Sequence, residues 1–231
     1  MTEGRRILVN WKKGRLVLLA AVGVVCVVSI AMAIPSSRHS LLRAAGWALV
    51  FQDGLPSSRE HPVADIIVIS HEADGAGILE AVDLVHEGVA ARVAMFADPP
   101  DSVDQEFLRR GIPYIDATTI SIQQLHALGV ASVEQIPWAV EGTHDEANTL
   151  PGWVTSKGFR TILFISTTDH SRRTHRLLAR TLPGSGIRVI MRYSRYSPFD
   201  PNSWWLTRNG ARTEIVEAEK LLLDFLRHPL S

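Results

Sequence analysis

The sequence predicts an α/β fold: a Rossmann-like three-layer domain with a mostly parallel sheet, preceded by one transmembrane helix. Beyond residue 64, runs rich in Val and Ile alternate with segments of helical period, which is the pattern of parallel strands joined by crossover helices. These runs are apolar throughout, which indicates that helices cover both faces of the sheet. A separate uncharged run at 16–34 predicts the membrane helix.

The uncharged run, LVLLAAVGVVCVVSIAMAI, is long enough as a helix to cross a hydrocarbon core of roughly 30 Å. Five basic residues precede it, whereas only Arg38 and Arg43 follow closely, so the positive-inside rule predicts a cytoplasmic N-terminus and an extracytoplasmic domain. The membrane is thus an expected partner. A cleaved signal peptide is the alternative, because Ala31-Met32-Ala33 fits a cleavage site, although the run exceeds the usual secretory apolar region.

The expected parts are a cytoplasmic segment at 1–15, the transmembrane helix at 16–34, a juxtamembrane segment at 35–63 and one domain at 64–231. We expect a helix and a leading strand within 35–63. The 24 basic and 24 acidic residues cancel, which disfavours nucleic acid as a partner. The single cysteine, Cys26, lies in the apolar run, so the domain has no thiol for disulfides, thiolate catalysis or zinc ligation.

Within the domain, apolar runs and helical periodicity predict the elements in order. Strands are expected at 65–70, 91–97, near Tyr114, at 161–166 and at 187–193. Helices are expected at 76–87, 103–110, 121–128, about 143–157, 171–182 and 213–227. Pro151-Gly152 predicts a kink or a break in the fourth helix.

Polar loops follow three of these strands, and ligands bind beyond the carboxyl ends of strands in open α/β sheets. We therefore expect the loops to share one rim and to supply ligand-binding side chains. The candidates are His71 and Asp74 after the first strand, Asp98 after the second, and Thr167, Thr168, His170, Arg172 and Arg173 after the fourth.

The last of these loops predicts an anion site. Arg172 and Arg173 fall in the first turn of a helix, where the macrodipole makes cations unfavourable. A phosphate-like or carboxylate ligand, held with His170, would compensate them. The alternative is that Asp169 or Thr168 caps the helix while both arginines point into water.

Thr143 and Glu146 have the Thr-x-x-Glu spacing of a capping box, so we expect them to cap the fourth helix. Glu141 precedes this box and is a candidate ligand or general base at the rim. A solvated loop carboxylate is the alternative for Glu141.

Several standard sites lack sequence support. Gly75-Ala76-Gly77 does not complete a dinucleotide-binding GxGxxG, and neither a GxSxG elbow nor a Walker loop is present. His71, Asp74, Asp98 and His170 offer nitrogen and oxygen ligands, but without the spacing of a metal motif. We therefore predict no metal and leave any cofactor unknown.

A resemblance to a known family rests on five features in order. They are the strand start Ala64-Asp65-Ile66-Ile67-Val68, a Glu-x-Thr-x-x-Glu-Ala segment at 141–147, a Lys-Gly-Phe-Arg turn, a strand running into Thr167, and His170-x-x-Arg173. From about residue 41 to the end, including the acidic closing helix at 212–226, the chain resembles the YdcF/SanA/ElyC-like family of bacterial envelope proteins.

The resemblance implies a bacterial inner-membrane protein with a periplasmic Rossmann-like domain linked to peptidoglycan or surface-polysaccharide metabolism. By position it implies site residues at Glu141, Thr143, Thr167, His170, Arg173 and Glu217, of which we take Glu141 and His170 as catalytic. The expected function is action on, or binding of, an anionic or phosphorylated precursor, lipid-linked or free.

Three departures from the family favour an alternative function. His71-Glu72-Ala73-Asp74 replaces the family's glycine pair, and Asp98-Pro99-Pro100 replaces its serine-glycine turn. The family's arginine on the first helix also has no counterpart. The alternative is a non-catalytic assembly or regulatory factor of the envelope with a degenerate ligand site.

Overall fold

The computed structural model describes residues 19, 22–23, 29, 32–55, 62–114, 116–140 and 142–229. The chain divides into two units, 1–45 and 46–231. Helix α2, Pro35–Ala48, begins in the first unit and ends in the second. The second unit holds the sheet and all the elements that follow.

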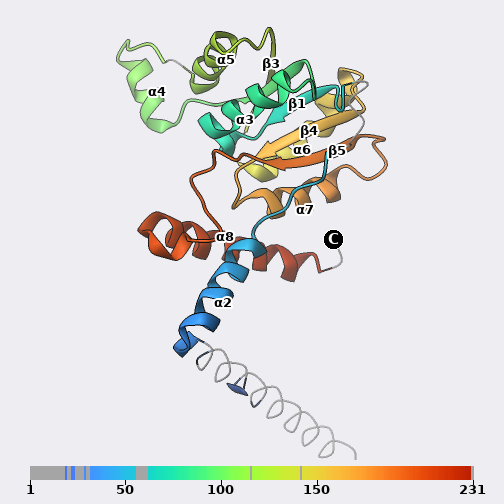
Figure 1. The fold of residues 1–231 in the computed structure, drawn as a ribbon. Helices are drawn as coiled ribbons and strands as arrows, with labels where there is room; N and C mark the ends of the chain where they lie inside the picture. Colours follow the sequence, from blue (N-terminus) through green and yellow to red (C-terminus); the bar gives the residue numbers. More distant parts are fainter. Residues whose placement is uncertain are drawn as a thin grey trace, which may run out of the picture. The chain divides into compact units, whose positions relative to one another are not determined.

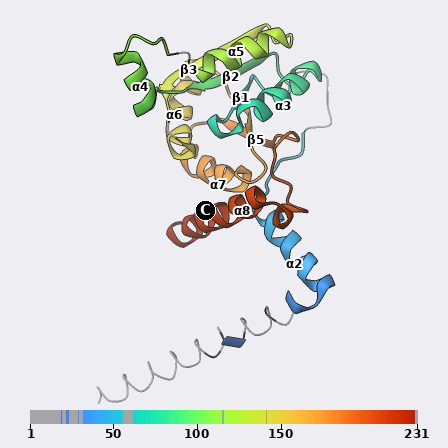
Figure 2. The same cartoon turned by 90° about the vertical axis from the view of Figure 1, so that its left-hand side faces the viewer.

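Strands and helices alternate along this second unit (Figures 1 and 2). The strands are β1 Ile66–Ile69, β2 Arg92–Ala97, β3 Ser132–Ala139, β4 Thr161–Ser166 and β5 Arg188–Tyr193. The α-helices are α3 Asp74–His86, α4 Ser102–Arg109, α5 Ala117–Ala127, α6 Thr143–Ser156, α7 Ser171–Thr181 and α8 Arg208–Arg227, and two 3-10 turns are η1 His71–Ala73 and η2 Trp204–Leu206.

The five strands form one sheet in the order β3-β2-β1-β4-β5, and every neighbouring pair is parallel. This agrees with the α/β pattern of the sequence. β1 is central, with Ile67 opposite Val93 of β2 on one side and Leu163 of β4 on the other. The order of the strands reverses between β1 and β4, and such a switch point is where open α/β sheets bind ligands.

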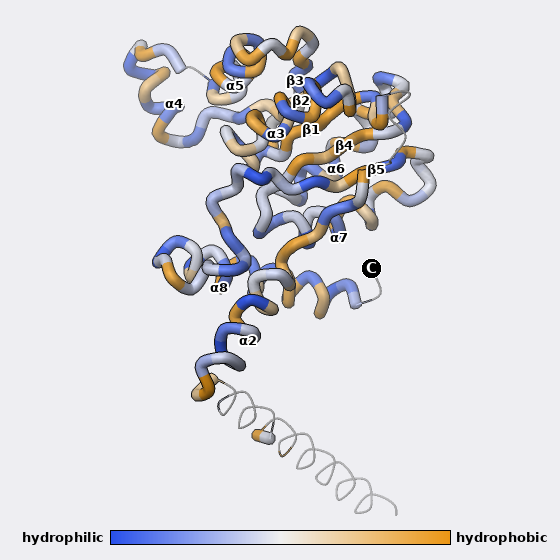
Figure 3. Tube along the Cα trace, viewed as in Figure 1, coloured by the Kyte–Doolittle hydropathy of each residue, from blue (hydrophilic) through white to orange (hydrophobic). Residues whose placement is uncertain are grey.

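Two apolar layers cover the sheet, because successive strand residues face opposite sides. Ile67, Ile69, Leu163 and Ile165 pack with α3 and α5, whereas Ile66, Val68, Ile162 and Phe164 pack with α6 and α7. All eight side chains are fully buried. The colouring of Figure 3 shows this concentration of apolar residues along the central strands.

Helix α8 buries carboxylate side chains and exposes apolar ones. Its buried residues are Glu214, Glu217 and Leu221, whereas Ile215 and Leu226 are 65% and 71% exposed. Two of the three side chains that it turns inward are therefore carboxylates. Polar contacts with α7, more than apolar burial, hold this helix.

The described residues do not support the transmembrane helix of the predicted fold class. Among the residues that the structure describes, no helix is both long enough and apolar enough to cross a membrane. The run at 16–34 lies for the most part outside the described residues. The helix that follows it, α2, has 14 residues, or about 21 Å, and contains Arg38 and Arg43, so it is too short and too charged.

The third strand was predicted in the wrong place. Residues 112–114 have no regular structure, and the strand is β3 at Ser132–Ala139. β3 contains Pro137, which argues against a central strand but is tolerated here because β3 lies at the edge of the sheet. The leading strand expected in 35–63 is also absent from residues 49–55, although Asp53 pairs with Met191 through its backbone N–H and its carboxylate.

Helix α6 differs from its prediction at two points. It is a single helix that contains Pro151, so the predicted break is absent, and the buried Leu150 and Trp153 pack in the core cluster that includes sheet residues. The capping box is also wrong, since Gly142 is the N-cap and no side chain caps the helix. Thr143 is already the first helical residue, so Glu146 lies too far along to bond back to the cap.

Close packing of α3 on β1 gives a stability prediction for Gly77. A Cβ there would lie 2.5 Å from Cγ2 of Ile69 and 2.7 Å from Cβ of Ala73, whereas at Gly75 nothing lies within 4 Å. We expect Gly77→Ala to lower the free energy of unfolding by about 1–3 kcal/mol. Gly75→Ala should leave it unchanged or raise it by about 0.5–1 kcal/mol. Chemical denaturation measures both, and equal stabilities would contradict the packing argument.

Candidate functional site

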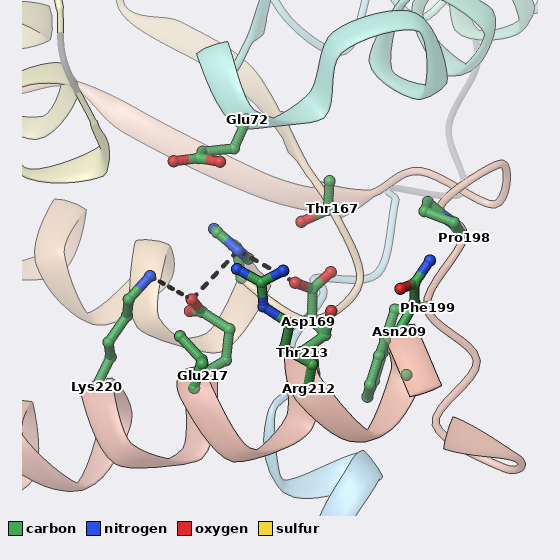
Figure 4. Close-up of a pocket in the computed structure, with 13 residues that line it drawn as sticks. Glu72, Thr167, Asp169, Pro198, Phe199, Asn209, Arg212, Thr213, Glu217 and Lys220 are labelled. Atoms are coloured by element: carbon green, nitrogen blue, oxygen red, sulfur yellow. Dashed lines mark hydrogen bonds and ion pairs between the residues drawn. The ribbon is translucent and has the colours of Figure 1, made fainter. Parts of the chain in front are cut away.

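A cavity of about 500 Å3 lies at the carboxyl ends of β1 and β4, with α8 as its far wall (Figure 4). This is the switch point of the sheet. Loop residues after β1, β4 and β5 and one face of α8 line it. They are Glu72, Thr167, Asp169, His170, Pro198, Phe199, Asn209, Gly210, Arg212, Thr213, Val216, Glu217 and Lys220.

His170 is the centre of a buried polar network in this cavity. Its Nε2 lies 3.1 Å from Oδ2 of Asp169 and 3.4 Å from Oε1 of Glu217. In Figure 4, Thr167 lies above Asp169, and its hydroxyl faces that carboxylate. The hydroxyl is buried and has no hydrogen bond of standard geometry to any described residue. The structure thus brings the predicted residues Thr167, His170 and Glu217 together.

The network favours a charged imidazole. Burial alone would lower the pKa of His170, but the hydrogen bond and charge of Asp169, with the charge of Glu217, raise it above its usual value. Burial would likewise raise the pKa of Asp169, but the hydrogen bond and charge of His170 hold it below its usual value. His170 and Asp169 therefore form an ion pair that keeps a proton at the cavity wall.

Arg173 has a partner inside the protein. Its Nε lies 3.1 Å from Oε2 of Glu217, and Nζ of Lys220 lies 2.7 Å from Oε1 of the same carboxylate. Glu217 is 3% exposed. Arg173 does not line the cavity, so the buried carboxylate, not a ligand, offsets this cation at the start of α7.

Arg172 and Thr168 serve the fold and do not line this cavity. Arg172 donates to the carbonyls of Ala48 and Val50 at 2.6 and 2.7 Å, which tethers the segment leading into the sheet. Thr168 is buried, and its backbone N–H donates a hydrogen bond to Oγ of Ser197. The ligand contacts predicted for Arg172 and Thr168 therefore stay predictions, and neither residue lines this cavity.

Two further candidates lie elsewhere. Thr143 is buried in the first turn of α6 and lines neither this cavity nor its neighbour. Glu141, predicted as catalytic, lies outside the residues that the structure describes. The predicted clustering of Glu141 with Thr167 and His170 thus stays a prediction.

His71, Asp74 and Asp98 line a second cavity of about 320 Å3 at the ends of β1 and β2. Nε2 of His71 lies 3.9 Å from Oδ1 of Asp98. Glu72 lines both cavities, so the two adjoin. The three polar loops therefore meet at one edge of the sheet, in two neighbouring cavities.

Glu146 underlies the loop between the cavities. Its carboxylate accepts hydrogen bonds from the hydroxyl of Ser70 and the backbone N–H of His71. Burial raises the pKa of Glu146 to about 7, against the lowering effect of those bonds. Glu146 thus anchors the loop after β1 instead of capping α6.

The sequence did not predict that α8 forms one wall of this cavity. Asn209, Thr213, Val216 and Lys220 recur at helical spacing and face the cavity together with Arg212. Arg212 is exposed and has no hydrogen bond or ion pair with any described residue. The polar stripe along the closing helix was the available signal, because it runs on the face that also carries Glu217.

Glu214 is a buried carboxyl group behind this wall. It is 5% exposed, and its Oε2 has no hydrogen-bond partner among the described residues. Burial, and then the charge of Asp169, raises the pKa of Glu214 to about 7. Glu214 is therefore largely protonated in mildly acidic solution.

The ion pair between Arg173 and Glu217 predicts that Arg173→Ala destabilises the fold more than Lys220→Ala, although Lys220 contacts the same carboxylate. Arg173→Ala should lower the free energy of unfolding by about 1–3 kcal/mol, because it removes a charged hydrogen bond from a buried carboxylate. Lys220→Ala should cost less than about 1 kcal/mol, because Lys220 is 48% exposed. Urea denaturation of both variants without ligand checks this, and equal losses would contradict it.

Glu214 predicts a dependence of stability on pH. Because its folded pKa is raised, its stabilising contribution is complete below pH 4.5 and is lost as the pH rises towards and beyond 7. Glu214→Gln cannot ionise, so its melting temperature relative to the parent should increase between pH 5 and pH 8. The exposed Glu219→Gln, on the same helix, is the control and should show no such trend. A constant difference for Glu214→Gln would refute the assignment.

Comparison with protein-family models finds no match for this chain, and comparison with curated proteins finds no significant one. The likeness to the YdcF/SanA/ElyC-like family therefore stays an expectation from the residues quoted above.

Proposed function

We propose that this domain binds a phosphorylated or otherwise anionic ligand in the cavity at the switch point. The observation that carries the proposal is Arg212, a guanidinium that faces the cavity and has no partner among the described residues. A guanidinium suits phosphate or carboxylate recognition, because its donors match the oxygens of either group.

The charge balance around the cavity supports an anion. Asp169 and Glu217 are offset within the protein by His170, Arg173 and Lys220. The remaining groups are Arg212 on α8 and Glu72 on the opposite loop. The described lining residues thus carry three cations and three carboxylates, and Arg173, which pairs with Glu217 from outside the lining, adds a fourth cation.

Neutral donors and the start of α7 add to this preference. His170 is the N-cap of α7, so the positive end of that helix dipole meets the cavity beside the imidazole. Thr167 contributes a hydroxyl, and Asn209 contributes an amide. These groups supply the hydrogen bonds that a multiply charged oxygen anion requires.

His170 is the candidate proton donor of the site. Its pKa is raised and it pairs with Asp169, although Nη2 of Arg173 lies 3.4 Å from its Nδ1, so in its protonated form it would attract the anion and be able to protonate a leaving oxygen. The proposal is one of binding, with His170 as the residue through which any acid catalysis would act.

The resemblance to YdcF/SanA/ElyC-like proteins suggests the class of ligand: a phosphorylated precursor of cell-envelope polymers. The second candidate, a non-catalytic envelope factor, is favoured by one observation. Glu72 and Asp74 occupy the loop after β1, where nucleotide-binding relatives of this fold place glycines close to phosphate. Under this alternative the cavity would have no anion to bind.

Binding of N-acetylglucosamine 1-phosphate by the full-length chain tests the proposal. Thermal denaturation should show stabilisation by about 2.7 kcal/mol at 100 times the dissociation constant. Arg212→Ala should weaken binding by roughly 10- to 100-fold, as expected for a lost charged hydrogen bond. Arg208→Ala removes a cation from the same helix outside the cavity and should leave binding unchanged.

Unphosphorylated N-acetylglucosamine is the ligand control and should not stabilise the protein. Equal effects of the Arg212 and Arg208 variants would show that the ligand binds elsewhere. Failure of N-acetylglucosamine 1-phosphate, glucose 1-phosphate and inorganic phosphate alike would favour the non-catalytic alternative.

A further inference from the structure

The second cavity differs in charge from the first. Glu72, Asp74 and Asp98 line it, and His71 is the only basic side chain among its lining residues. Glu72 and Asp74 make no hydrogen bond or ion pair with any described residue. Asp98 reaches only His71, at 3.9 Å. The carboxylates that line the cavity therefore carry more negative charge than its one basic lining side chain can offset.

Two helix starts face this cavity and reduce that excess without removing it. Asp74 begins α3, and Ala117 begins α5. Each helix start contributes roughly +0.5 of a charge. Together they offset about one of the three carboxylates, so the cavity stays negative even with His71 protonated. A second phosphate group would be repelled here, and a cation would be favoured.

A buried hydroxyl is an independent sign that the cavity is built for a ligand. Ser121 is 7% exposed and lines the cavity, yet its hydroxyl has no hydrogen-bond partner among the described residues. The neighbouring Thr118 is different, because its hydroxyl donates to the carbonyl of Phe96 at 2.8 Å. Because Ser121 lines the cavity and no described residue bonds its hydroxyl, a ligand that donates a hydrogen bond can pair with it directly.

The cation that fits is an ammonium group. Among the described residues, no group of three or more His, Cys, Asp or Glu could hold a metal ion. The carboxylates are instead spread around a cavity of about 320 Å3. An ammonium group needs only separate acceptors for its three N–H bonds.

We propose that one ligand spans both cavities, with its anionic group beside Arg212 and a primary amine beside Asp98 and Ser121. Glu72 lies between the two groups, because it lines both cavities. The substrate class is thus an amino-phosphate zwitterion, such as a phosphorylated amino sugar or amino alcohol. This inference rests on the proposed anion site and adds the second half of the ligand.

A series of ω-aminoalkyl phosphates, with two to six carbons, tests the inference against n-alkyl phosphates of equal length. Calorimetry on the full-length chain should find one length at which the amine tightens binding at least tenfold. Asp98→Asn should abolish that gain while leaving the n-alkyl phosphate affinity unchanged. Asp74→Asn should reduce the gain, because it removes another carboxylate from the cavity lining. Glu219→Gln controls for net charge.

Each outcome decides between the two proposals. If n-alkyl and ω-aminoalkyl phosphates bind equally at every length, the amine site is refuted and the anion site stands. If neither series binds, both proposals fail. If the gain persists in both Asp98→Asn and Asp74→Asn, while their melting temperatures match the parent's, the amine binds outside this cavity and the inference is overturned.

Discussion

The contact between α7 and α8 is charged, and the shape of the site depends on it. Three arginines on one face of α7 meet two carboxylates on α8: Arg173 pairs with Glu217, and Arg176 and Arg180 pair with Asp224. Leu221, with the half-buried Ala218, is the apolar part of this interface. Buried ion pairs tolerate little displacement, because separating them leaves charge without a partner. They therefore fix α8 at one position along α7, which places Arg212 and Asn209 opposite the strand ends.

The loop after β1 shows how this fold has been adapted. Helix starts at the ends of parallel strands favour phosphate, and glycines normally let it approach. Here Asp74 occupies the first position of α3, and Glu72 lies just before it. The protein's own carboxylates therefore lie where other proteins of this fold bind phosphate. The proposed anion site lies instead on the α7 and α8 side, where His170 and Arg212 line the first cavity. Two cavities with different lining charges thus lie next to each other at one edge of the sheet.

Local patterns in the sequence were enough for four of the five strands but not for the site. β1 and β4 were predictable because uniform apolar runs require burial on both faces, whereas Pro137 concealed β3, whose edge position only the folded chain reveals. Thr167 and His170 followed from the rule that loops at strand ends bind ligands. The partner of Arg173 could not be deduced, because helix periodicity does not tell which distant carboxylate will face it. Arg212 was missed for the same reason: its role depends on where α8 docks.

Because α8 follows all the strands in the chain, the sheet can form during synthesis before the cavity is complete. The sheet and α7 can assemble once residue 193 has been made, but the far wall of the cavity comes from residues 209–220 near the C-terminus. Until that segment leaves the ribosome, Arg173, Arg176 and Arg180 face solvent and the cavity has only one side. The proposed ligand binding therefore needs α8, and loss of residues 209–227 would remove this wall of the cavity while leaving all five strands in the chain.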